Sequence, residues 1–300
     1  MSQLLQNGLP TSGAEFTLQG PVLSQDAFRR LAGIAMREAG LCIADNKSDM
    51  VRTRLARRLR HLGLPDYESY CAYVETAEGE HELGQLISAL TTNVSHFFRE
   101  NHHFDILATE VAPELKAKAK AGSATRIWSA GCANGQEPYT IAMVLSQLGL
   151  GPDNGLRILA TDIDPTVVSF AQAGCYPEHM LNGLSAEHRA KFLEPAQGND
   201  LRVTDALRRF VAFRVLNLLK PWPMSGRFDV VFCRNVVIYF DKATQAALWT
   251  RFAEKIIPGG WLFLGHSERI SPDAELYFEK ANVTAYRRTD APVTTARKGS

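Results

Sequence analysis

The first part of the chain has the hydrophobic spacing of α-helices. Residues 24–40 open on a serine, carry apolar residues at helical spacing and close on a glycine, which is typical of a capped helix. The same kind of pattern predicts a second helix over 47–62 and two shorter ones over 66–77 and 79–90. Because no alternating strand pattern interrupts them, residues 23–90 are expected to form a small all-helical domain.

From residue 125 onward, short apolar runs alternate with helical patterns. The expected strands are 126–130, 156–164, 228–235 and 261–267, the expected helices are 137–148, 165–174 and 242–257, and 275–280 with 283–288 is expected to form a terminal hairpin. Alternation of strands and helices predicts an α/β domain in which helices cover both faces of a parallel sheet. The rhythm breaks between residues 175 and 215, where an inserted subdomain with a small antiparallel hairpin is expected.

These patterns divide the chain into five parts. They are a loose leader over 1–22, the helical domain over 23–90, a linker with a first helix over 91–124, the sheet domain over 125–290 with its insert, and a loose tail over 291–300.

Composition and charge exclude several classes of protein. The 300 residues are 45% hydrophobic and 22% charged, with a formal net charge of +1, so no overall field favours nucleic acid or a membrane surface. The five cysteines are dispersed and form no C-x-x-C pair, which fits reduced thiols better than disulfides or a zinc site. No secretory signal pattern and no apolar run of spanning length is present, so a cytoplasmic protein is expected.

A glycine loop follows the first expected strand, in the stretch SAGCANGQEPYTIAMVL over 129–145. Its spacing around Gly131 and Gly135 is neither the dinucleotide pattern nor the P-loop pattern. Glu137 follows in the first helical turn, where a carboxylate would repel a pyrophosphate. A ligand with a positive group fits better, and Gly131 would let the backbone approach it. The alternative is that Glu137 only complements the helix dipole, a contribution of about 0.3–1 kcal/mol.

Two more polar clusters follow later strands, where ligands of such sheets bind. Asp162 lies near the end of the second expected strand, 27 residues after Gly135, a little beyond the roughly 20 expected for a carboxylate that binds ribose hydroxyls. Arg234 and Asn235 close the third expected strand, with Tyr239 four residues on. A ribose, no phosphate and a positive charge together favour S-adenosylmethionine as the ligand.

The second expected helix is strongly basic. It carries Arg52, Arg54, Arg57, Arg58 and Arg60 with no acid between them. Such a run is often a solvated face. Here the arginines lack acidic i,i+4 partners and repel one another, so this face is a candidate dock for an acidic partner. RNA is a weaker alternative, because no aromatic residues are interleaved with the basic ones.

Five motifs in order resemble one family. LTTNVSHFFRE (90–100), WSAGCANGQEPYTIA (128–142), ATDIDPTVVSFAQAGCY (160–176), FCRNVVIYFD (232–241) and LFLGHSE (262–268) are similar to stretches of the CheR-type chemotaxis receptor methyltransferases. The resemblance covers about residues 25–290. It implies a helical N-terminal domain, a Rossmann-like S-adenosylmethionine domain and an inserted β-subdomain. It also implies transfer of a methyl group to glutamate carboxylates of chemoreceptors, giving γ-methyl esters and S-adenosylhomocysteine without a metal.

The resemblance assigns roles residue by residue. Arg99 matches an arginine beside the transferred methyl group, Glu137 an acid that pairs with the methionine ammonium, and Asp162 the acid on the ribose. Tyr239 matches an active-site tyrosine. The other expected cofactor-binding residues are Asn93, Ser95, Gly131, Asn217, Leu218, Arg234 and Asn235, of which Asn217 and Leu218 match contacts on the adenine side.

The chemistry of a carboxylate nucleophile refines these expectations. A glutamate side chain has a reference pKa near 4.3 and is ionised at neutral pH, so no general base is needed. Arg99 and Tyr239 are therefore expected to orient the acceptor, whereas the alternatives are a structural ion pair of Arg99 with Glu100 or another acid, and simple packing of Tyr239.

The basic helix would meet the cytoplasmic helical domain of the receptor, through which a monomeric enzyme would be recruited to membrane arrays. Binding of a receptor tail to the insert is not favoured, because 194–200 lacks a G-x-G pattern.

Two other functions stay open. One is methylation of another substrate such as nucleic acid, and the other is a signalling module that binds without turnover. Two further sites are not supported by the spacing. Residues 265–269 lack the second glycine of a nucleophile elbow, and His96, His102 and His103 lack the spacing of metal ligands.

Overall fold

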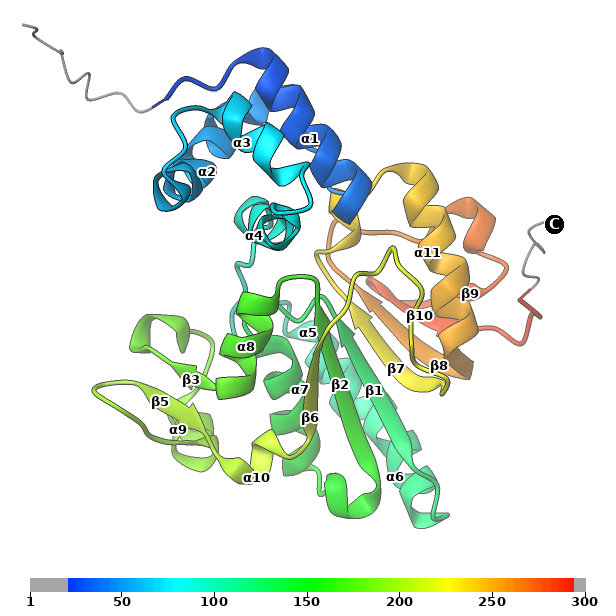
Figure 1. Ribbon diagram of the computed structural model, residues 1–300. Coiled ribbons are helices and arrows are strands. Elements are labelled where there is room, and N and C mark those ends of the chain that lie inside the picture. The colour runs from blue at the N-terminus through cyan, green and yellow to red at the C-terminus, as the bar shows by residue number, and fades with distance from the viewer. Residues whose placement is uncertain (1–20, 294–300) are drawn as a thin grey trace, which may run out of the picture.

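The computed structural model describes residues 21–293, shown in Figure 1. Residues 1–20 of the expected leader over 1–22 and residues 294–300 of the expected tail over 291–300 lie outside the described residues. The described chain forms a helical domain, a domain built on a seven-stranded sheet, and a small second sheet.

The helical domain contains the four predicted helices. They are α1 (Gln25–Ala39), α2 (Ser48–Leu62), α3 (Tyr67–Val74) and α4 (Glu80–Leu90). The caps expected from the sequence are present: the Ser24 hydroxyl accepts from the backbone N–H of Ala27, and Gly40 ends α1 in the left-handed region at φ 69°. One face of each helix contributes to a common apolar core around Leu31, Leu55 and Tyr70.

The large sheet has the strand order β6-β2-β1-β7-β8-β10-β9. Its strands are β1 (Thr125–Ala130), β2 (Leu156–Asp162), β6 (Val211–Val215), β7 (Phe228–Cys233), β8 (Ile256–Leu264), β9 (Phe278–Asn282) and β10 (Ala285–Arg288). The first five strands in this order pair in parallel, whereas β10 is antiparallel to both β8 and β9. The sheet and the terminal hairpin are as predicted, although β8 begins five residues earlier than expected, at Ile256.

Helices cover both faces of this sheet. They are α5 (His102–Ile106), α6 (Ala112–Lys120), α7 (Gln136–Gln147), α8 (Pro165–Ala173), α10 (Asp205–Arg208) and α11 (Lys242–Lys255). A π-helical turn over Leu107–Val111 joins α5 to α6. Neighbouring residues of β1 belong to different apolar cores, Ile127 to one and Trp128 to the other. Both faces are therefore buried, which explains the continuous apolar runs of these strands.

The insert is smaller than expected. Its sheet has the antiparallel order β3-β5-β4, built from β3 (Cys175–Tyr176), β4 (Leu193–Pro195) and β5 (Leu201–Val203), with α9 (Ala186–Phe192) beside it. The expectation that the insert extends to residue 215 is wrong, because 211–215 is strand β6, which pairs in parallel with β2 in the large sheet. Strand β6 lies at the edge of the large sheet and its residues alternate in burial, as residues of a hairpin strand also do. The sequence pattern alone therefore does not distinguish the two.

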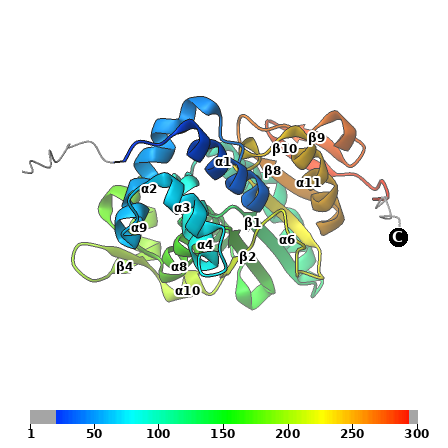
Figure 2. The same cartoon turned by 45° about the horizontal axis from the view of Figure 1, so that its top comes forward.

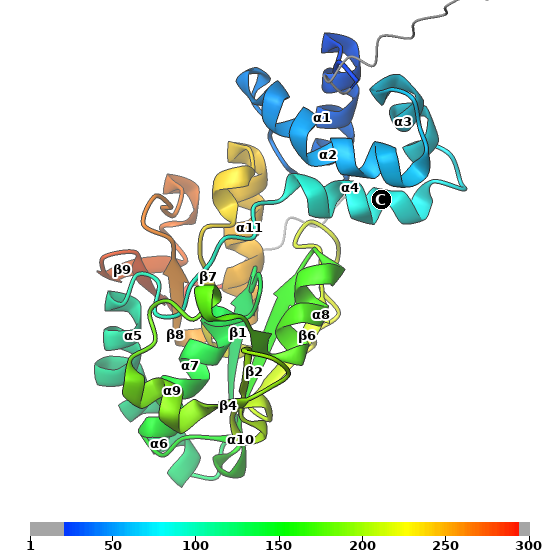
Figure 3. The same cartoon turned by 90° about the vertical axis from the view of Figure 1, so that its left-hand side faces the viewer.

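The helical domain lies over the carboxyl ends of the parallel strands, and the linker after α4 runs down to α5 (Figures 2 and 3). Helix α4 contacts α8. The Asn217 amide donates to the Glu38 carbonyl over 2.7 Å, and the Cys42 N–H donates to the Tyr239 carbonyl over 2.8 Å. Within residues 21–293 no helix is long and apolar enough to span a membrane, and no cluster of metal-ligating side chains occurs.

Candidate active site

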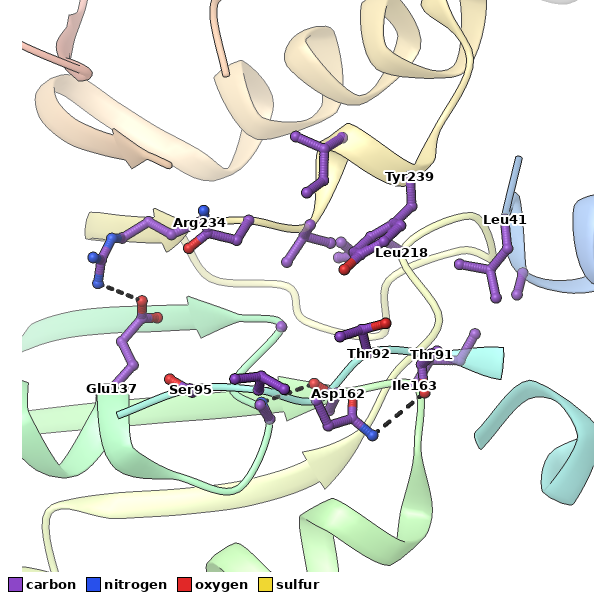
Figure 4. Close-up of a pocket in the computed structure, with 18 of the residues that line it drawn as sticks. Leu41, Thr91, Thr92, Ser95, Glu137, Asp162, Ile163, Leu218, Arg234 and Tyr239 are labelled. Atoms are coloured by element: carbon purple, nitrogen blue, oxygen red, sulfur yellow. Dashed lines mark hydrogen bonds and ion pairs between the residues drawn. The ribbon is translucent and has the colours of Figure 1, made fainter. Parts of the chain in front are cut away.

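A cavity of about 380 Å³ lies between the carboxyl ends of the strands and the helical domain (Figure 4). All of the residues that the sequence assigned to the cofactor or to the chemistry line it: Asn93, Ser95, Arg99, Gly131, Glu137, Asp162, Asn217, Leu218, Arg234, Asn235 and Tyr239. The fold thus brings together residues from the linker, from three strand ends and from the segment after β6. Which of them contacts the cofactor stays a prediction.

The two glycines of the loop after β1 are required by backbone conformation and packing. Gly131 has φ 91°, and a Cβ there would come within 2.2 Å of Val236. Gly135 has φ 88°, and its Cβ would come within 2.7 Å of Ala171. Gly131 was expected to allow close approach of a ligand, and the structure shows that its missing side chain also leaves room for Val236 in the loop after β7.

Glu137 is buried and paired. Its carboxylate accepts a hydrogen bond of 2.7 Å from the Ser129 hydroxyl and lies 2.9 Å from an Arg234 Nη (Figure 4). Burial raises the pKa of the Glu137 carboxyl, while the charge of Arg234 and the bond from Ser129 favour the ionised form. The sequence predicted an acid that pairs with the ammonium group of the ligand, and the pairing with Arg234 was not anticipated.

Arg234 also contacts a second acid, Glu100, at 3.2 Å. The Arg234 guanidinium is buried, donates to the Arg99 carbonyl and lies over the ring of Phe104. Arg234 lines the cavity, but its charge is shared between Glu100 and Glu137, so it is first of all the centre of an ion-pair network. If Arg234 contributes to cofactor binding, as predicted, it does so mainly through Glu100 and Glu137.

Glu100 was not singled out in the sequence analysis. Its carboxylate also accepts from the backbone N–H of His266 at 3.3 Å and lies 3.2 Å from the ring of that residue. Burial alone would raise the pKa of Glu100, but Arg234 and His266 lower it to about 2. Its backbone has φ 55°, an unusual conformation for glutamate that persists only where surrounding contacts fix it.

Asp162 ends β2 and lies farther along the cavity from Glu137 (Figure 4). Its carboxylate accepts hydrogen bonds from the backbone N–H groups of Ala133, at 2.9 Å, and Asp164, at 3.1 Å. Burial raises the pKa of Asp162, and the two backbone donors oppose that shift. These bonds fix the carboxylate between the glycine loop and the end of β2, where it borders the cavity.

The character of the cavity fits S-adenosylmethionine. Acids stand at two places, Glu137 and Asp162, and the apolar side chains of Leu41, Ile163 and Leu218 lie on the side of Asp162 away from Glu137 (Figure 4). A sulfonium compound with an ammonium group, ribose hydroxyls and a flat base would find a partner for each part. A pyrophosphate would meet the Glu137 carboxylate instead.

Two of the predicted cofactor contacts use their side chains to hold the cavity walls. The Asn93 amide donates to Asp164 over 2.8 Å. Asn217 donates to the Glu38 carbonyl and accepts from the Leu219 N–H over 2.8 Å. Both residues line the cavity, but these amide groups are already engaged in joining segments of the protein.

Arg99 and Tyr239 keep polar groups available at the cavity. One Arg99 Nη donates to the Val94 carbonyl over 2.9 Å, and within residues 21–293 Arg99 forms no ion pair. The alternative of a structural ion pair with Glu100 is therefore wrong, because Glu100 pairs with Arg234. The Tyr239 hydroxyl has no hydrogen-bond partner in the described part of the chain, although its ring packs against the core of the helical domain.

Glu268, to which no role was assigned from the sequence, holds the loop after β7. The buried Glu268 carboxylate accepts from the backbone N–H groups of Asn235, Val236 and Val237, each at 2.9 Å. It also accepts from Gly265 at 2.6 Å. Asn235 has φ 59° at the start of this turn. Glu268 lies in the motif LFLGHSE, so the signal was present, but its long-range partners were not visible in the sequence.

The basic helix α2 divides into structural and exposed arginines. Arg58 is paired with the fully buried Glu82 through bonds of 2.8 and 2.5 Å, and Arg54 donates to the Leu90 and Thr91 carbonyls at the end of α4. The expectation that all five arginines form a docking face is too broad, because partners distant in sequence engage these two. Arg52, Arg57 and Arg60 are exposed, and only they remain candidates for docking.

Comparison with known proteins agrees with this architecture. Residues 26–91 match the family model described as "CheR methyltransferase, all-alpha domain", and residues 93–287 match "CheR methyltransferase, SAM binding domain". A probable chemotaxis protein methyltransferase of Rhizobium etli is 43% identical over 84% of this chain and 96% of its own length. The chemotaxis protein methyltransferase of Salmonella typhimurium is 40% identical over 89% of this chain and 93% of its own. The chain belongs to the CheR methyltransferase family, and its sheet domain is an S-adenosylmethionine-binding methyltransferase domain.

Proposed function

We propose that this enzyme methylates glutamate side-chain carboxylates of chemoreceptors, giving γ-methyl esters and S-adenosylhomocysteine, and so serves adaptation in a chemosensory pathway. The observation that carries the proposal is an Arg99 guanidinium without an acidic partner among the described residues, in a cavity whose acids suit a cationic methyl donor. The names of the Rhizobium etli and Salmonella typhimurium relatives support the same reaction.

S-adenosylmethionine supplies an electrophilic methyl group when it is bound. Glu137 would receive its ammonium group and Asp162 its ribose hydroxyls, with the base beside Leu218. This arrangement leaves the sulfonium between the two acids, in a cavity that Arg99 and Tyr239 also line.

Arg99 and Tyr239 would orient the acceptor carboxylate. A guanidinium offers a planar fork for a carboxylate. The Tyr239 hydroxyl donates to none of the described residues, so it could donate a hydrogen bond to the acceptor. The acceptor is already ionised at neutral pH, so neither residue has to move a proton. Alignment of the acceptor and removal of water from it are the remaining contributions to lowering the activation barrier. Positioning of this kind lowers the barrier by at most roughly 7–11 kcal/mol.

The exposed arginines of α2 would contact the acidic helices in the receptor's cytoplasmic domain. Arg52, Arg57 and Arg60 are free of buried structural bonds, unlike Arg54 and Arg58. We infer that the enzyme acts as a monomer in the cytoplasm and reaches membrane receptor arrays through this contact. The charge of the patch would mainly raise the rate of encounter.

Transfer of label tests the proposal. The protein is incubated with methyl-tritiated S-adenosylmethionine and membranes that contain receptors, and the product is treated with mild alkali. A carboxyl ester releases volatile methanol, and a matched reaction with Arg99→Ala should release it at least about a hundredfold more slowly. Label that survives alkali would contradict an ester. Label on added RNA would favour the alternative substrate, and binding of S-adenosylhomocysteine without any transfer would favour a non-catalytic module.

A further inference from the structure

Two ion pairs that share Arg234 join three charged side chains at one end of the cavity. Arg234 lies 2.9 Å from Glu137 and 3.2 Å from Glu100, and all three side chains are largely buried. Glu137 borders the cavity, whereas Glu100 lies behind Arg234 and does not line it. The group therefore holds two negative charges and one positive charge, with the positive charge in the middle.

Glu137 and Arg234 alone would be a poor receptor for an ammonium group. An ion pair has no net charge, so a cation close to Glu137 would be attracted by the carboxylate and repelled by the guanidinium. The repulsion is strong in a buried site, where little water screens it. Glu100 supplies the second carboxylate that offsets Arg234.

The surroundings of Glu100 leave this negative charge in place. The residues that face it are Arg234, the Asn235 amide at 3.4 Å, His266 and His103, whose Nδ1 lies at 3.6 Å. Burial first, and then the charge of Arg234, lower the pKa of His103 to about 3, so its ring is neutral. Among residues 21–293, His266 is the one remaining titratable neighbour, and its side chain is 70% exposed.

The backbone conformation turns the side chains of Arg99 and Glu100 in different directions. Phe98 and Glu100 both have positive φ, 56° and 55°, on either side of Arg99. Arg99 lines the cavity, while Glu100 reaches Arg234. This conformation is unfavourable for residues other than glycine, so the surrounding contacts must hold Glu100 there.

We propose that Glu100 is a positioning residue that determines cofactor specificity: by offsetting Arg234 it leaves Glu137 with the net negative charge that selects a ligand carrying an ammonium group. Glu100 acts through Arg234 and does not touch the ligand. The proposal rests on binding of S-adenosylmethionine and its product, and is independent of which acceptor is methylated.

The test compares ligands that differ in the ammonium group. Dissociation constants are measured by calorimetry at pH 8 for S-adenosylhomocysteine and for its deamino analogue, which keeps the carboxylate and lacks the ammonium. The variants are Glu100→Gln, which keeps the shape, and Glu100→Gly, which removes the carboxylate at a backbone position that glycine adopts freely. Glu100→Asp keeps the charge and is the matched control.

The expected result is a change in discrimination between the two ligands. In Glu100→Gln and Glu100→Gly, affinity for S-adenosylhomocysteine should fall about tenfold, a change of about 1.4 kcal/mol, while affinity for the deamino analogue is kept or rises. Glu100→Asp should discriminate as the unmodified protein does. Equal losses for both ligands would show a merely structural role and overturn the proposal, as would unchanged affinities. Because the ratio is read from binding, failure of methyl transfer to receptors would leave this test intact.

Discussion

The amide of Asn93 donates a hydrogen bond of 2.8 Å to the carboxylate of Asp164. Asp164 follows β2 and is the N-cap residue of α8. The Ser88 hydroxyl, in the last turns of α4, donates to the same carboxylate oxygen over 2.7 Å. The Asn134 amide in turn donates to the Asn93 carbonyl over 3.2 Å. These bonds hold the start of the linker against the sheet domain and complete one wall of the cavity.

Loss of this attachment should loosen the wall. In Asn93→Ala the linker loses its bond to the buried Asp164, a cost of about 1–3 kcal/mol. Amide exchange over residues 91–97 should become faster, and affinity for S-adenosylhomocysteine should fall about tenfold. Asn101→Ala, which removes a comparable amide bond to the exposed Asp105, is the control. Weaker binding without faster exchange would instead indicate that Asn93 acts by direct contact with the cofactor.

Arg99→Ala should separate binding from turnover. Because the guanidinium lines the cavity and pairs with no acid among the described residues, its removal leaves no buried charge unpaired and should leave the melting temperature and S-adenosylhomocysteine affinity nearly unchanged. The rate of methyl transfer should fall by at least about a hundredfold, equivalent to about 2.7 kcal/mol of lost orientation. Arg99→Lys should recover only part of the rate, since an ammonium lacks the planar fork. Undiminished turnover in Arg99→Ala would refute the assigned role.

Glu268 should control the geometry of the loop that carries Asn235 and Tyr239. In Glu268→Gln an amide N–H₂ replaces one oxygen and confronts backbone N–H donors that the carboxylate accepted. We expect the rate of methyl transfer to fall about tenfold or more, with faster amide exchange over 235–239. Glu275→Gln, at an exposed position, should behave as the unmodified protein. Normal exchange and a normal rate in Glu268→Gln would show that the loop does not need this carboxylate.

The two kinds of arginine on α2 should respond differently to substitution. Charge reversal in Arg57→Glu or Arg60→Glu should raise the KM for receptor and leave cofactor affinity intact, with Lys120→Glu at the far end of α6 as a control of equal charge change. Arg58→Ala should instead destabilise the helical domain by about 3–5 kcal/mol in chemical unfolding, because Glu82 stays buried without its partner. A stable Arg58→Ala with an impaired KM would contradict this division.

Local patterns in the sequence were sufficient for most elements of the fold. Caps and apolar spacing identified α1 and α2, and buried apolar runs identified β1, β2 and β7. The error at β6 has a physical reason: a short strand with alternating burial has the same pattern in an edge strand and in a hairpin, and only its pairing with β2 decides between them.

Some residues of the candidate site could be predicted from the sequence, whereas their pairings could not. Residues at strand ends, such as Glu137 and Asp162, could be identified because topology brings all carboxyl ends to one edge of the sheet. Pairings across long distances could not, because neither the contact of Glu100 with Arg234 nor that of Arg58 with Glu82 follows a local spacing. The charge state of the site depends on these pairs, so Glu137 could be identified from the sequence but the network that surrounds it could not.

A crystal structure of the complex with S-adenosylhomocysteine tests the central claim most directly. The account predicts the ligand in the cavity between the sheet and the helical domain, with its ammonium within hydrogen-bond distance of Glu137, its ribose hydroxyls on Asp162 and its sulfur facing Arg99. A ligand bound elsewhere, or turned so that its ammonium lies away from Glu137, would contradict it.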